Sequence, residues 1–302
     1  MAPAADYLFL SIETLITSIS LIIMVPCIVT LIRTQGMHAN CKVLLVTSAS
    51  VQMLLLCVQI ALFTNNFIAE NLLPQNLMNE RPFLMAQNTH FTMSSYISML
   101  LVVERAFAVW KASEYEKVGR HPVSLMILIG GALIMGMLHV YAIYWHGWFY
   151  ETIWVLHAIE GSTLMISIAL IVYARRKIVN MPYDGDRLSA MYQVKEVLDF
   201  SVAILPSIIL SAIMHTLSLV PTILNISGVI SYPVCCIFYF SIHSVNCIFT
   251  KLALIISHKG MRQRFRTIIF RKPRSPKVVV EEMDADREGQ HHFAQMKAAW
   301  DG

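Results

Sequence analysis

Seven stretches of this 302-residue sequence are long and apolar enough for a helix to cross a lipid bilayer, which takes about 20 residues. Only 14% of the residues are charged, against roughly 25% in an average soluble domain, and 56% are hydrophobic. A soluble domain has too little interior for so much apolar surface, so the excess must face lipid. Since lipid offers the backbone no hydrogen bonds and the alternating pattern of a membrane β-barrel is missing, the sequence predicts an all-α bundle of seven transmembrane helices. The predicted spans are residues 7–32, 43–63, 84–103 (continuing to 109), 123–144, 152–173, 198–220 and 226–256.

Basic residues give the orientation of this bundle. Of the 23 Lys and Arg residues, 22 fall in the first, third and fifth loops or in the region from Lys251 onward, and only Arg81 falls on the other side. The positive-inside rule then places the N-terminus outside the cell and the C-terminus in the cytoplasm, as an odd number of spans requires. We predict three parts: a transmembrane bundle over residues 1–256, an amphipathic membrane-surface helix over 257–272 and a flexible cytoplasmic tail over 273–302.

The third span is the weakest of the seven because it is polar. It contains the run Asn88-Thr89-His90-Phe91-Thr92-Met93-Ser94-Ser95. Polar side chains are tolerated in a membrane helix when other helices surround them or when they line a cavity. We therefore expect the third span to lie at the centre of the bundle.

The polar residues of the spans do not form the patterns of an enzyme. The histidines stand singly, and no His-Glu-x-x-His or Gly-x-Ser-x-Gly run occurs. A light-sensing pigment needs a lysine midway along the seventh span, but Lys251 lies close to the cytoplasmic end. None of the six cysteines falls in a predicted outer loop, so no disulfide framework is indicated. The sequence therefore indicates no enzymatic activity, no cofactor and no metal site, and leaves a receptor, with a ligand-gated ion channel or small-solute transporter as the alternative.

The cytoplasmic end of the third span favours a receptor. It carries Glu104 followed by Arg105. The carboxylate can hold the guanidinium by a charge-assisted hydrogen bond in a resting state, and its release frees the arginine for an intracellular partner. Arg175 and Arg176 end the fifth span on the same side, although such a basic run is also an ordinary topology signal.

The residues before the sixth span predict a cytoplasmic extension of its helix. Leu188, Met191 and Val194 follow helical spacing there. Glu196, at the base of this extension, is positioned to reach toward Arg105 across the bundle, which we state as a hypothesis.

Two features flank the bundle. Residues 257–272 place apolar side chains on one helical face and arginines on much of the other, a pattern that predicts a helix on the anionic lipids of the inner leaflet. Asn225 begins an Asn-Ile-Ser glycosylation sequon in the last outer loop. This sequon lies so near the membrane that chance occurrence is the better explanation for it.

Two motifs resemble a known receptor family. Glu104-Arg105-x-x-Ala108 resembles the Glu-Arg-x-x-Ala motif of nematode serpentine chemoreceptors. Leu188-Ser189, followed by Tyr192-Gln193-x-Lys195-Glu196, resembles the Leu-Ser-x-x-Tyr-Gln-x-x-Glu-Asn run before the sixth helix of those receptors. With its length and short N-terminus, the chain resembles the Sra superfamily, which includes the alpha, ab, beta and epsilon classes. The resemblance implies a chemosensory receptor that couples to a heterotrimeric G protein through these motifs. Its expected location is the plasma membrane, and in sensory neurons the ciliary membrane.

Such a receptor is expected to bind its ligand in the outer half of the bundle, among the middle helices. Glu160 is the strongest candidate, because an acid inside the membrane is a functional residue by default. It suggests a polar or cationic small molecule. The expected partners are thus this ligand, the G protein and membrane lipids, and no nucleic acid. Besides Glu160, the candidate ligand-binding residues are His157 on the same helical face and Asn88, Thr92, Ser95 and Met99 on one face of the third span.

Overall fold

A computed structural model of the chain describes residues 4–34, 37–68, 81–112, 122–180 and 188–270. This part of the chain is helical and contains no strand. Seven of its helices include a stretch long and apolar enough to cross a membrane, which confirms the predicted all-α fold. The predicted tail over 273–302 lies outside the described residues. The helices are α1 (Ala4–Arg33), α2 (Ala39–Ile68), α4 (Arg81–Trp110), α6 (Pro122–His146), α7 (Phe149–Asn180), α8 (Leu188–Ile226), α9 (Tyr232–Ser257) and α10 (Lys259–Phe270).

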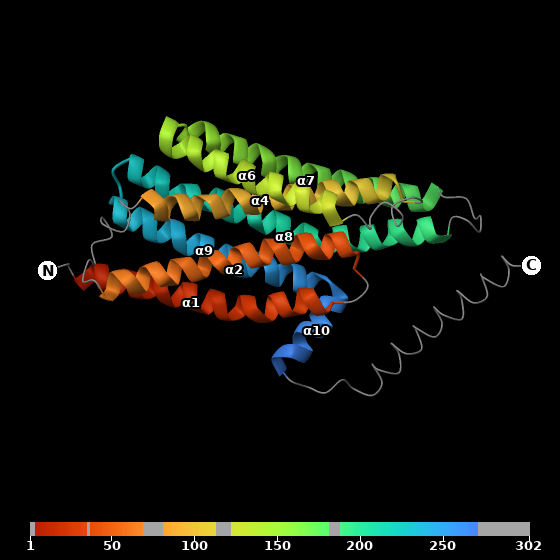
Figure 1. The fold of residues 1–302 in the computed structure, drawn as a ribbon, viewed down its shortest axis with the longest axis horizontal. Helices are drawn as coiled ribbons and strands as arrows, with labels where there is room; N and C mark the ends of the chain where they lie inside the picture. The colour runs from red at the N-terminus through yellow and green to blue at the C-terminus, as the bar shows by residue number, and fades with distance from the viewer. Residues whose placement is uncertain (1–3, 35–36, 69–80, 113–121, 181–187, 271–302) are drawn as a thin grey trace, which may run out of the picture.

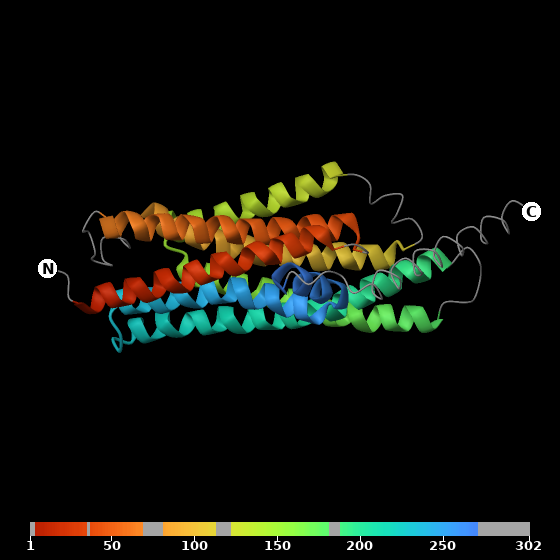
Figure 2. The ribbon, with the colours of Figure 1, turned by 90° about the horizontal axis from the view of Figure 1, so that it is seen from below.

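The seven long helices run side by side along one axis (Figures 1 and 2). The predicted central position of the third span is confirmed, because α4 packs against α2, α6, α7 and α8. The closest pairing is between α8 and α9, and α1 packs against α2 and α9. At the end that the basic residues mark as cytoplasmic, α7 and α8 extend past the ends of α1 and α2 (Figure 1). Since α8 begins at Leu188, the predicted cytoplasmic extension of the sixth helix is present.

The outer start of the last span differs from our prediction. We expected it near residue 226, but α8 continues to Ile226 and α9 begins at Tyr232. The turn between them contains Gly228, whose φ of 72° lies in the left-handed region that glycine adopts without a steric penalty. The prediction is wrong because α8 continues through Thr222 and Asn225, polar residues that we expected in the loop, and the turn falls at residues 227–231 instead. Pro233, in the first turn of α9, fits a helix start because the first amides need no partner within the helix.

Packing is close where α4 meets α6. Gly136 of α6 is buried there, and a Cβ at this position would lie 2.7 Å from Cγ of Met93 on α4. Small residues allow this approach of two backbones, which is a common basis of helix association in lipid. The outer face of α6 is apolar instead, with Met126 70% exposed and Ile127 68% exposed. Side chains of this kind fit a helix with one face toward lipid.

The short helix α10 turns away from the bundle axis after α9 (Figure 1). Met261 anchors it, since this side chain is fully buried and Phe265 packs against the same core. Lys259, Arg262 and Arg266 are exposed. The predicted eighth helix is therefore present and amphipathic.

Candidate functional site

A polar cavity lies inside the bundle, between α2, α4, α7, α8 and α9. Its volume is about 50 Å³, and it reaches from Glu160 on α7 to Lys251 on α9. Hydroxyl groups make up much of its wall. The polar lining residues are Ser48, Gln52, Ser94, Ser95, Ser98, Glu160, Thr163, Ser207, Ser211, Thr250 and Lys251.

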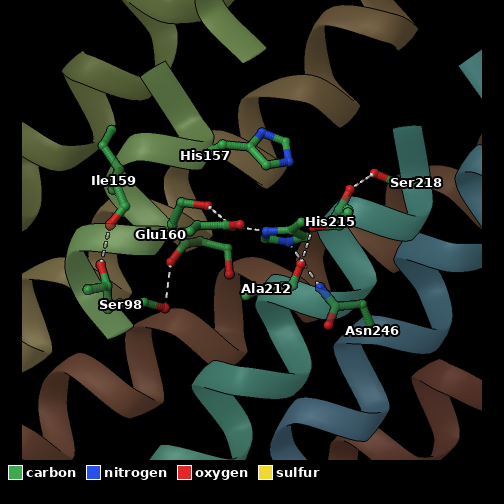
Figure 3. A network of polar contacts seen from close by, with 12 residues as sticks. Ser98, His157, Ile159, Glu160, Ala212, His215, Ser218 and Asn246 are labelled. Carbon is green, nitrogen blue, oxygen red and sulfur yellow. Dashed lines mark hydrogen bonds and ion pairs between the residues drawn. The ribbon is translucent and has the colours of Figure 1, made fainter. Parts of the chain in front are cut away.

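Glu160 forms the centre of a polar network that joins four helices (Figure 3). One carboxylate oxygen accepts a 2.9 Å hydrogen bond from Ser95 of α4 and pairs with Nδ1 of His215 on α8. On the other side of the imidazole ring, Nδ2 of Asn246 on α9 lies 3.1 Å from Nε2. Since that amide donates to Nε2, Nδ1 carries the proton that faces Glu160. The network thus compensates a carboxylate that would otherwise be costly inside the membrane.

The other predicted ligand-binding residues of the third span serve contacts between helices. Asn88 donates a 2.7 Å hydrogen bond to the hydroxyl of Tyr144 on α6, and its oxygen accepts one from Tyr239 on α9. The hydroxyl of Thr92 donates to the carbonyl of Asn88 within α4 at 3.0 Å and also lies 3.4 Å from the carbonyl of Gly136 on α6. Met99 accepts a hydrogen bond from the hydroxyl of Thr163 on α7.

His157 lies on α7 one turn before Glu160. Its Nδ1 donates a 2.9 Å hydrogen bond to the carbonyl of Ile153, and its buried Nε2 has no hydrogen-bond partner in the described part of the chain. Of the six predicted ligand-binding residues, the structure brings only Ser95 and Glu160 to the wall of the cavity. A role in ligand binding stays a prediction for all six.

Sequence reasoning missed the remainder of this site. His215 counted as one more single histidine, although its pairing with Glu160 depends on the packing of α7 against α8. Gln52 and Lys251 were not singled out as site residues. A signal was available for both, because each is a polar side chain within a predicted span, and such residues tend to be functional.

A second buried network joins α1, α2 and α9. Glu13 of α1 is 2% exposed and accepts a 3.2 Å hydrogen bond from Nε2 of Gln59 on α2. Oε1 of Gln59 accepts a hydrogen bond from Ser244 on α9, whose hydroxyl also lies 3.3 Å from that of Thr17. The two buried acids Glu13 and Glu160 therefore have separate surroundings, and Glu160, unlike Glu13, borders the cavity.

At the cytoplasmic end of α4, the predicted Glu104–Arg105 pair is present. Nε and Nη2 of Arg105 donate to the two carboxylate oxygens of Glu104 at 2.5 and 2.8 Å. The arginine side chain is only 2% exposed, and its guanidinium lies 5.9 Å from the ring centre of Phe200 on α8. Two parallel charge-assisted hydrogen bonds fix the guanidinium between α4 and α8.

Glu196 has a different direct contact from the one we expected. Its carboxylate accepts a 2.9 Å hydrogen bond from the backbone amide of His38, in the link between α1 and α2. It still lies near enough to Arg105 for an electrostatic interaction. Arg175 and Arg176 are exposed on α7, whereas the next residue, Lys177, donates a 2.6 Å hydrogen bond to the carbonyl of Val109 near the end of α4.

A cytoplasmic cleft of about 240 Å³ lies beside this region. It brings together Tyr192 and Glu196, which the receptor motif singled out, and His258 between α9 and α10. Burial lowers the pKa of His258 below its ordinary value of 6.5, although Asp199 opposes the shift. The neutral ring accepts a 3.2 Å hydrogen bond from the amide of Met261. The full lining is Met37, Tyr192, Lys195, Glu196, Asp199, Phe200 and His258.

Asn225, the predicted glycosylation site, lies in the last turn of α8. Its side-chain amide donates a 3.0 Å hydrogen bond to the carbonyl of Ile230 and so stabilises the turn to α9. Glycosylation of Asn225 stays a prediction.

Seven membrane helices around a polar cavity, with a buried Glu-Arg pair at the cytoplasmic end of the central helix, are typical of G-protein-coupled receptors. The sequence matches the Sre G protein-coupled chemoreceptor family over residues 2–301. The chain therefore belongs to this family of nematode serpentine receptors, which is part of the Sra superfamily. The match confirms the resemblance and decides among the classes that the two motifs left open. A comparison with curated proteins found no match.

Proposed function

We propose that this seven-transmembrane chemoreceptor binds a small polar or cationic molecule at Glu160 and signals to a heterotrimeric G protein. The observation that supports this most is the pairing of His215 with Glu160, which borders the cavity. A cationic group that approaches Glu160 competes with His215 for the same carboxylate. Ligand binding at this point therefore loosens the contact between α7 and α8.

Helix α8 provides the route from the cavity to the cytoplasm. It carries His215 in the bundle and Glu196 in the cytoplasmic cleft, roughly 28 Å apart along a continuous helix. Phe200, on the same helix, lies under the guanidinium of Arg105. A shift of α8 thus changes the surroundings of the Glu104–Arg105 pair and frees the arginine for the G protein.

The ligand-binding part is tested on cells that express the receptor with a panel of the smallest primary amines, beginning with ammonium and methylamine, because the cavity beside Glu160 has a volume of only about 50 Å³. We expect Glu160→Gln to weaken any amine response at least tenfold, since a tenfold loss corresponds to about 1.4 kcal/mol, less than a buried charge-assisted contact provides. Glu151→Gln is the matched control, because Glu151 lies exposed at the outer end of the same helix. Amine responses that persist in Glu160→Gln across the pH range would refute charge recognition.

The coupling part needs no ligand. With receptor and G protein reconstituted in lipid nanodiscs, we expect Glu104→Gln to raise basal nucleotide exchange, because it weakens the bonds that hold Arg105. Arg105→Ala is expected to abolish exchange above background while surface expression is retained, and Arg33→Ala, an exposed arginine on the same side, is the control. Ligand-gated current in cells without a compatible G protein would support the channel alternative instead.

We further propose the plasma membrane, and in sensory neurons its ciliary part, as the location, with α10 on the anionic inner leaflet. The exposed Lys259, Arg262 and Arg266 support the lipid contact. A fluorescent fusion of the full chain tests the location. Replacing all three basic residues by Gln is expected to weaken the contact of α10 with phosphatidylserine in vesicles that contain the receptor. Equal contact in the wild type and in this variant would contradict the proposed lipid contact.

A further inference from the structure

Lys251 is a buried cation that the proposed signalling mechanism does not use. It lies within α9, is 7% exposed, and its Nζ donates a 2.9 Å hydrogen bond to the hydroxyl of Ser48 on α2. An ammonium group has three donor hydrogens. In the described part of the chain, Lys251 makes no other hydrogen bond and has no carboxylate within ion-pair distance. Because an isolated charge is strongly disfavoured away from water, this amine either loses its proton or has its charge compensated by its surroundings.

The cavity beside Lys251 contains further unused polar groups. Gln52 of α2 is 4% exposed, and its Oε1 has no hydrogen-bond partner among the described residues. On the α8 wall, the hydroxyls of Ser207 and Ser211 also make no hydrogen bond within that part of the chain. Two remaining ammonium hydrogens and two serine hydroxyls therefore face one enclosed space from α9 and α8.

The size of the cavity limits its occupant. A volume of about 50 Å³ corresponds to roughly three to five water molecules, at about 10–15 Å³ for each. Organic ligands of drug size need roughly 300 Å³ or more. The space therefore fits a monatomic ion with one or two waters, and it excludes larger organic anions.

The charges around Lys251 favour an anion over a cation. Glu160 borders the same cavity and keeps its negative charge beside the neutral His215, but its carboxylate accepts hydrogen bonds from Ser95 and His215 and makes no ion pair with Lys251 in the described part of the chain. Asn246, which bonds to His215, precedes Lys251 by about 7.5 Å along α9, so the acidic end and the basic end of the cavity are separate. Two buried thiols, those of Cys27 and Cys247, interact electrostatically with Lys251 and are 0% and 4% exposed.

We propose that the basic end of this cavity binds a small monovalent anion, chloride in the cell. The ammonium of Lys251 and the hydroxyls of Ser207 and Ser211 donate to the anion, and a water beside it donates to Oε1 of Gln52. The bound anion joins α9 to α8, and through Ser48 to α2, so it stabilises the arrangement described here. The proposed ligand at Glu160 borders the same cavity, so the tests below are made without a ligand, and they do not involve a G protein.

The first test measures the thermal stability of the purified full-length receptor in chloride against gluconate at constant ionic strength. Wild-type receptor is expected to show a saturable rise of Tm with chloride, since a ligand of the folded state stabilises it by mass action. Lys251→Met should lose this rise, and Lys259→Met, which removes an exposed positive charge, should keep it. No rise in the wild type, or an equal rise in Lys251→Met, would overturn the proposal.

A second measurement covers the case in which Lys251→Met does not fold. Equilibrium binding of radioactive chloride to the wild type should give one ion per chain, displaced by bromide and not by gluconate. The double variant Ser207→Ala, Ser211→Ala keeps the lysine and should raise the apparent Kd roughly tenfold or more, since it removes two hydrogen bonds to a charged group. Absence of binding to the wild type would refute the anion site, and would indicate that an uncharged amine or a thiolate of Cys27 or Cys247 takes its place.

Discussion

The pairing of Glu160 with His215 predicts a measurable energetic coupling between α7 and α8. Glu160→Gln keeps the shape of the side chain, and His215 then stays neutral, so no charge is left unpaired. We expect a cost of about 1–2 kcal/mol, because a charge-assisted hydrogen bond is lost and such bonds between membrane helices reach about 1.7 kcal/mol. His215→Gln should cost more, about 2–3 kcal/mol, because the carboxylate then keeps only the hydrogen bond from Ser95.

A double-mutant cycle isolates the interaction. If the two side chains pair in the folded receptor, the double variant should be less destabilised than the sum of the single variants by about 1–2 kcal/mol. Equilibrium unfolding in SDS with a thiol-reactive dye can report this, since Cys27, Cys41 and Cys247 are free and buried.

The control cycle combines Glu160→Gln with Thr267→Ala, a change in α10, which packs on α1 and α9. These two changes should be additive within about 0.5 kcal/mol. A coupling between Glu160 and His215 no larger than in this control would refute the pairing, and with it the view that a ligand at Glu160 releases α8.

Two further predictions concern packing and pH. Gly136→Ala should destabilise the receptor by about 1–3 kcal/mol in the same unfolding assay, because its Cβ would lie 2.7 Å from Cγ of Met93. Gly131→Ala on the same helix, where a Cβ would have nothing within 4 Å, should be neutral or stabilising by up to about 1 kcal/mol. Equal effects of the two substitutions would contradict the close approach of α4 and α6. Because burial lowers the pKa of His258, the unfolded chain binds the proton more readily, so stability is present above the ordinary pKa of 6.5 and is lost as the pH falls below it. His258→Asn, which retains an acceptor, should remove part of the stability change between about pH 7.5 and about pH 5.5, and an unchanged pH profile would count against this role.

Much of the architecture was predictable because a membrane imposes simple rules on a sequence. Span length and the satisfaction of backbone hydrogen bonds gave seven helices, and the polar third span indicated its own central position. The start of the last span was not predictable in this way. Helix α8 continues to Ile226, and only a tight turn at Gly228 separates it from α9.

The candidate site was predictable only where one side chain carried its own signal. Glu160 is an acid within a span, and Arg105 follows an acid at the end of the central helix, so each could be singled out from local sequence. The partners of Glu160 could not be predicted from local sequence. His215 is 55 positions from Glu160 in the sequence, and Ser95 is 65 positions from it. The outer-half residues Asn88 and Thr92 are equally polar in sequence, yet the structure places them in contacts between α4 and α6.

The sequence by itself thus determined the environment of each segment: which residues lie in lipid, which end faces the cytoplasm, and where polar groups must be buried. These properties depend on hydrophobicity and charge, which act on each helix separately. The tertiary structure alone decided which polar groups meet, because that depends on the rotation and offset of packed helices. It paired Glu160 with His215 and left Lys251 without a carboxylate beside a small polar cavity, and these two outcomes define the candidate ligand site and the proposed anion site.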